Sequence, residues 1–135
     1  MKLKPGLMGE ASMTVQVGNT AAEVGSGSVP VFSTPMLVAI MENAAINALK
    51  EHLPEGSTTV GGRIECRHLA PTPIGMTVTA RAQLVEVVKN KLVFKIEAYD
   101  ELEKVGEAEH DRFVIDHQGF LKQNMEKKKK WEDAM

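Results

Sequence analysis

The sequence predicts a single α+β domain in which a curved antiparallel sheet of about five strands wraps around one long central helix. The chain has 135 residues, enough to bury one hydrophobic core without disulfides or metal ions. Residues 34–49 are apolar on nearly every side, which is typical of a buried helix. Much of the remaining chain alternates between apolar and polar residues, which is typical of strands. A helix that apolar must be covered, so we expect the sheet to curve around it and a second subunit to cover the rest.

The chain begins with a predicted strand and then the helix. Polar and apolar side chains alternate over residues 12–17, which predicts the first strand. The helix is predicted to begin at Ser33 or Thr34, because both are good N-cap residues and Pro35 suits the first helical position. A stop signal with proline and glycine follows in residues 52–56 and predicts where the helix ends.

The chain after the helix predicts four more strands. They cover residues 57–69, 76–88, 91–100 and 104–115. Gly61 and Gly62 predict a bulge or a close backbone approach within the first of them. The residues from Gly119 on predict a short solvated helix or a frayed end, so we divide the chain into a domain over 1–120 and a charged tail over 121–135.

Composition excludes several classes of protein. The chain is 43% hydrophobic and 25% charged, with a net charge of −2, which gives no electrostatic argument for binding nucleic acid or an anionic membrane. It has no apolar run long enough for a membrane span, and residues 1–6 are followed by no apolar segment of a signal peptide. The single cysteine, Cys66, cannot form an internal disulfide, and no metal-ligand spacing is present. We therefore expect a cytoplasmic protein without a metal or an organic cofactor.

Glu42 is the first candidate for a reactive group, because it is the one carboxylate in the apolar helix. Burying a carboxylate costs several kcal/mol unless it is hydrogen-bonded, paired or neutralised. Reaction chemistry is one reason to retain such a group. The other interpretation places Glu42 at the helix edge, where it faces solvent or pairs with a basic residue.

Four segments of the chain resemble a known family. They comprise residues 31–36 with Glu42, then 60–64, 67–78 and 109–115. Together with the order of strand, central helix and long strands, they are similar to hotdog-fold thioesterases of the fluoroacetyl-CoA thioesterase type, over roughly residues 1–120.

This resemblance implies a set of site residues. The catalytic threonine, glutamate and histidine of the family correspond to Thr34, Glu42 and His68. The glycine that lies against the acyl group corresponds to Gly61, and an arginine of the last strand corresponds to Arg112. Glu42 would attack the thioester carbon or activate water, and His68 would carry a proton to the leaving thiolate. The sequence does not separate the two roles of Glu42.

Each of these residues also has a purely structural interpretation. Thr34 could simply cap the helix, His68 could be a half-buried strand residue, and Arg112 could form a surface salt bridge. Thr34 and Glu42 are eight residues apart, which is about 12 Å along an ideal helix axis. If they act together, the helix must bend or a partner subunit must contribute.

The segment before the helix departs from the family. Fluorine-selective members have phenylalanines in a lid there, whereas residues 22–28 of this chain have none and include Gly25, Ser26 and Gly27. We expect a mobile lid, and a site that accepts small to medium acyl groups with little preference for fluorine.

The resemblance implies an acyl-CoA thioesterase that acts as a homodimer or tetramer, with acyl-CoA as its small-molecule partner. Two alternatives remain: a non-catalytic acyl-CoA-binding hotdog protein, and a hotdog hydratase or dehydratase. An assay of thiol release from short acyl-CoAs separates hydrolysis from binding alone.

Overall fold

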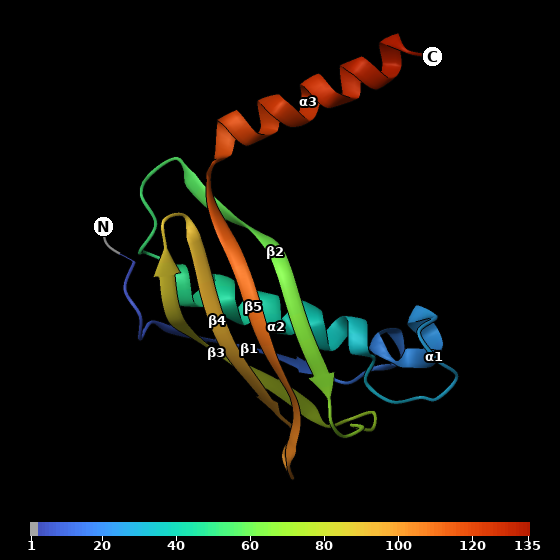
Figure 1. Ribbon diagram of the computed structural model, residues 1–135. Coiled ribbons are helices and arrows are strands. Elements are labelled where there is room, and N and C mark those ends of the chain that lie inside the picture. Colours follow the sequence, from blue (N-terminus) through green and yellow to red (C-terminus); the bar gives the residue numbers. More distant parts are fainter. Residues whose placement is uncertain (1–2) are drawn as a thin grey trace.

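The computed structural model describes residues 3–135. The elements run in the order β1 (Met8–Thr14), η1 (Val17–Asn19), α1 (Ala21–Val24), α2 (Thr34–Leu49), β2 (Ser57–His68), β3 (Thr77–Val88), β4 (Lys91–Tyr99), β5 (Lys104–Asp116) and α3 (His117–Asp133). The five strands form one antiparallel sheet in the order β1-β3-β4-β5-β2 (Figure 1). The sheet curves across one side of α2, which confirms the predicted α+β architecture. No helix within residues 3–135 is long and apolar enough to cross a membrane.

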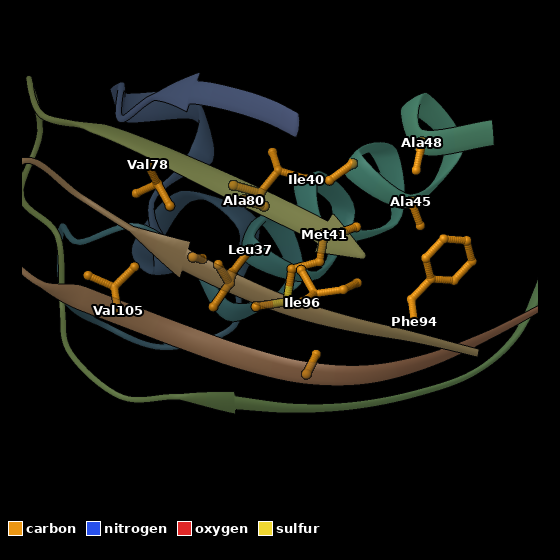
Figure 2. Close-up of a cluster of buried hydrophobic side chains, with 14 of the residues drawn as sticks. Leu37, Ile40, Met41, Ala45, Ala48, Val78, Ala80, Phe94, Ile96 and Val105 are labelled. Carbon is orange, nitrogen blue, oxygen red and sulfur yellow. The ribbon is translucent and has the colours of Figure 1, made fainter. Parts of the chain in front are cut away.

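The core lies between α2 and the concave face of the sheet (Figure 2). The buried face of α2 comprises Leu37, Ile40, Met41, Ala44, Ala45, Ala48 and Leu49. Alternate residues of β3 and β4 point at it and are buried, as the sequence pattern predicts. The opposite face of α2 is open: Ala39, Asn43 and Ile46 are exposed there. One sheet therefore covers only part of the apolar helix, and the remainder needs another cover.

The first strand differs from its prediction. It occupies Met8–Thr14 rather than residues 12–17, and it pairs with β3. A side chain on Gly9 would collide with the backbone of Ala44 and Ala48, so glycine is needed where β1 crosses α2. Alternation does not reveal this close approach, because the residue that makes it possible has no side chain.

The segment predicted to be flexible contains a short helix, α1, where Thr20 Oγ1 accepts a 3.4 Å hydrogen bond from the backbone of Glu23. Gly25 ends this helix with a φ of 78°, a left-handed conformation that suits glycine. The predicted mobility of residues 22–28 remains a prediction.

The last two features concern β2 and the tail. The strand pairing shifts between Gly61 and Arg63, which confirms the predicted bulge.

The tail is a helix, α3, which begins at His117, is capped by Asp116 and buries no residue. It projects away from the sheet (Figure 1). The division of the chain at residue 120 remains a prediction.

Candidate active site

The start of α2 brings Thr34 to His68. The N-cap of the helix is Ser33, whose hydroxyl accepts a hydrogen bond from the backbone of Met36 at 3.3 Å. The structural interpretation of Thr34 as the cap is therefore wrong. Its hydroxyl instead lies 2.8 Å from Nδ1 of His68, across the space between α2 and the end of β2. Because the cap is supplied by its neighbour, the Thr34 hydroxyl is available to the histidine.

His68 is half-buried, and burial lowers its pKa below the usual range, which favours the neutral imidazole at neutral pH. Its Nε2 atom is buried without a hydrogen-bond partner among the described residues. The Thr34–His68 pair opens into a hollow of about 310 Å³. Small side chains, including Ala21, Ser26 and Ala70, form part of its wall. This hollow is large enough for a small acyl group beside the pair.

Glu42 lies two turns further along α2, in a different environment. Its side chain is 39% exposed, so the expectation of a fully buried carboxylate is wrong for a single chain. It lies at the edge of the open face of α2, where β2 and β5 cover it only in part. Its Oε2 atom lies 3.8 Å from Nη1 of Arg112. A Cβ atom on Gly61 would lie 3.0 Å from the same oxygen, so the absence of a side chain keeps the carboxylate accessible.

Arg112 is held firmly beneath this carboxylate. Its side chain is 6% exposed, so it is not a residue of a surface salt bridge. Its Nε and Nη2 atoms donate to the hydroxyl and the carbonyl of Thr59 at 2.9 and 3.1 Å. Two sides of the guanidinium are therefore fixed, and Nη1 faces Glu42 and His110.

Sequence reasoning left His110 without a role, yet it belongs to the Glu42 group. Its Nε2 atom lies 3.3 Å from Nη1 of Arg112, and its side chain is buried. The available signal was its position two residues before Arg112 on one strand, which places both side chains on the same face of the sheet.

The five predicted residues thus form two groups within one chain. Thr34 and His68 form the first, and Glu42, Gly61 and Arg112 form the second. The helix rise separates Thr34 from Glu42 by about 12 Å. The Glu42 group includes His110 but not His68, so the predicted glutamate and histidine stand in different groups.

A family model agrees with this architecture. The model described as the fluoroacetyl-CoA-specific thioesterase family matches residues 15–118, which is most of the chain. The chain belongs to this family. The match ends at the second residue of α3, so nearly all of the projecting helix lies outside the matched region.

A curated relative gives the same assignment. It is the fluoroacetyl-CoA thioesterase of Streptantibioticus cattleyicolor, 36% identical over 90 residues. The match covers 67% of this chain and 65% of that protein, so the chain matches slightly less than two thirds of its relative's length.

Solved structures extend the likeness to nearly the whole chain. A thioesterase superfamily member from Thermus thermophilus is 26% identical, with 98% of each chain covered and a TM-score of 0.91. A point mutant of the fluoroacetyl-CoA-specific thioesterase is 27% identical, with 94% of this chain and 98% of that chain covered and a TM-score of 0.86. These matches confirm the hotdog thioesterase fold that the sequence motifs indicate.

Proposed function

We propose that this member of the fluoroacetyl-CoA-specific thioesterase family hydrolyses small acyl-CoA thioesters, in an active site shared by two copies of the chain. One observation carries the proposal. The Thr34–His68 pair and the Glu42–Arg112 group are complementary halves of a hydrolytic site, yet they are separate within one chain. A second copy can supply to each half what it lacks.

The edge strand β2 suggests how the halves meet. β2 lies at the edge of the sheet, so one side of this 12-residue strand has no neighbouring strand among residues 3–135. Such an edge usually needs cover. Antiparallel pairing of two β2 strands about a two-fold axis would join the two sheets. Gly61 is the fifth residue of β2, and His68 is the last. An axis between them would bring Glu42 of one copy toward His68 of the other.

The same arrangement would cover the open face of α2. Ile46, which is 40% exposed, and the exposed Ala39 lie on this face beside Glu42. A partner helix would remove these side chains from water and would bury the carboxylate further. This supports a homodimer as the working unit. A tetramer would need an additional interface.

Hydrolysis then follows from the chemistry of the two halves. Glu42 takes a proton from water, and the resulting hydroxide adds to the thioester carbonyl carbon. The tetrahedral oxyanion collapses and the carbon–sulfur bond breaks. The proton that Glu42 took from water passes through His68 to the departing sulfur, so both groups end in their starting protonation states. The products are the free acid and CoA. Thr34 fixes the imidazole through its 2.8 Å hydrogen bond, and the Arg112 guanidinium lies 3.8 Å from the Glu42 carboxylate.

Glu42 could instead act as a nucleophile. Its oxygen would bond to the acyl carbon as the carbon–sulfur bond breaks, and water would then hydrolyse the mixed anhydride. The 39% exposure of the side chain and the absence of a side chain on Gly61 leave an approach open for either route. Neither route uses a metal or an organic cofactor, so we expect a chelator to leave turnover unchanged. A cytoplasmic location remains part of the proposal, to be tested by cell fractionation.

The first test is the Glu42→Gln variant, assayed with short acyl-CoAs and a thiol reagent. The substitution keeps the size and removes the charge, so it should lower turnover at least about 100-fold while the protein remains folded. His68→Ala should also be severely impaired. Parental turnover in Glu42→Gln would overturn the hydrolytic mechanism. Acyl-CoA binding by the parent protein without thiol release would favour the binding-protein alternative.

A mixing experiment tests the shared site directly. Glu42→Gln and His68→Ala chains are refolded together, so that heterodimers form. In a shared site, each heterodimer has one intact site, and random pairing restores about a quarter of the parental turnover. The matched control mixes Glu42→Gln with the double variant Glu42→Gln/His68→Ala, which restores no site. If confirmed heterodimers stay inactive in the first mixture, the shared site is refuted.

A further inference from the structure

His110 is a buried titratable group that the proposed mechanism does not use. Its side chain is 1% exposed, and it lies under Glu42 and Arg112 on the inner face of β5. A Cβ atom on Gly61 would lie within 3.5 Å of Glu42, Arg112 and His110 alike, so all three side chains converge on one point. The position of His110 so close to the Glu42 carboxylate raises the question of its role.

The β2 bulge fixes the tautomer of His110. The pairing of β2 with β5 shifts next to Arg63, and the carbonyl oxygen of Arg63 lies 2.6 Å from Nδ1 of His110. A carbonyl oxygen can only accept, so the proton is on Nδ1. In the neutral ring, Nε2 is then left with a lone pair.

That lone pair faces Arg112. Nη1 of Arg112 lies 3.3 Å from Nε2 and can only donate to it. A proton on Nε2 would set two donors against each other. Burial, together with the positive charge of Arg112, lowers the pKa of His110, while the Arg63 carbonyl and the charges of Glu42 and Asp111 oppose this. The geometry and the charges both favour the neutral imidazole.

We propose that His110 is a positioning residue, which holds Arg112 against Glu42 by accepting a hydrogen bond from Nη1. Thr59 fixes Nε and Nη2 of the guanidinium, and His110 fixes the remaining nitrogen, the one that faces the carboxylate. Without this acceptor, Nη1 and the carboxylate would lose their fixed orientation toward the substrate. The inference rests on the proposed role of Glu42 in thioester hydrolysis.

Two substitutions test the two ring nitrogens of His110 separately. An asparagine amide ends near the position of Nδ1, whereas a glutamine amide reaches the position of Nε2. His110→Asn should therefore lose the acceptor for Arg112, and kcat should fall about 10- to 100-fold, as for a misplaced catalytic group. KM should change less than about threefold, because His110 does not contact the substrate. His110→Gln should restore most of kcat.

A double-mutant cycle tests whether His110 acts through Glu42. In the Glu42→Gln background, His110→Asn should lower the residual kcat by less than about twofold, because the group being positioned is already absent. Melting temperatures show that each variant is folded. Val78→Ala, a core variant on β3 with a buried side chain, controls for loss of stability alone and should keep parental kcat.

Three results would overturn the inference: parental kcat in His110→Asn, equal losses in folded His110→Asn and His110→Gln, or an undiminished effect in the Glu42→Gln background. Each leaves the proposed function standing if Glu42→Gln alone is inactive. Parental turnover in Glu42→Gln is a different result, which refutes the proposed function itself.

Discussion

Neighbouring hydroxyls at the start of α2 should have separable roles, one in stability and one in turnover. Ser33 is buried and caps the helix, whereas Thr34 is exposed and contacts His68. Thr34→Val keeps the shape of the side chain and removes only its hydroxyl. We expect kcat to fall about 10-fold or more, because the imidazole loses the contact that orients it.

Stability should show the reverse pattern, with a larger loss in Ser33→Ala than in Thr34→Val. Ser33→Ala removes the acceptor for the Met36 backbone and should cost about 1 kcal/mol. For a chain of this size, that lowers the melting temperature by about 3–5 °C. Thr34→Val removes one hydrogen bond at an exposed position and should cost about 0.5 kcal/mol. Thr34→Ser keeps the hydroxyl and should remain close to the parent in both measurements.

The assays are thiol release under saturating acyl-CoA and thermal unfolding at one fixed protein concentration, because the proposed dimerisation would make the melting temperature depend on concentration. The reasoning is refuted if Thr34→Val keeps parental kcat. It is also refuted if Ser33→Ala leaves the melting temperature unchanged while Thr34→Val lowers it by several degrees, because Thr34 would then be the cap.

Four further predictions concern other parts of the molecule. Gly61→Ala should lower kcat about 10-fold with little change in melting temperature, since the added methyl lies 3.0 Å from the Glu42 carboxylate; an unchanged kcat would contradict this. The free energy of unfolding should be highest above about pH 6.5 and should fall in more acidic solution. Burial lowers the pKa values of His68 and His110 in the folded protein, so as the pH falls these histidines are protonated in the unfolded chain before they are protonated in the folded one. A free energy of unfolding that stays constant from pH 7 to 5 would count against this. Fluoroacetyl-CoA should be favoured over acetyl-CoA by less than about tenfold in kcat/KM, since residues 22–28 contain no aromatic side chain. Removal of residues 121–135 should leave the melting temperature within about 2 °C of the parent, because these residues are exposed; a drop of 5 °C or more would show that α3 packs on something in solution.

Much of the fold could be predicted because it depends on local signals. Alternation over β3 and β4 predicts which side chains are buried, and Ser33 with Pro35 predicts where α2 begins. The shift of β1 could not be predicted in this way, since its cause is a contact between Gly9 and the helix backbone. The position of β1 depends on a contact between segments that are distant in the chain, and the alternation of apolar and polar residues does not predict such contacts.

In the candidate site, too, some features could be predicted from the sequence and others depend on distant contacts. The motifs identified Thr34, Glu42 and His68, but they did not show which hydroxyl caps the helix. Two adjacent residues could each do so, and the choice depends on His68, which is 34 residues away in the sequence. His110 was missed for a related reason. Its role depends on an acceptor on Arg63, a carbonyl of the backbone, and a side-chain motif cannot encode that acceptor.

The open face of α2 links these findings. An apolar helix predicts burial, but the sequence does not say whether its own sheet or a second copy provides the cover. The sheet covers the face with Leu37 and Met41 and leaves Glu42 partly exposed at the edge of the open face. If a second copy covers this side, dimerisation both buries the remaining apolar surface and brings the carboxylate to the histidine. Folding and catalysis would then depend on the same interface, so a variant that dissociates the dimer should lose turnover before it loses the structure of the sheet.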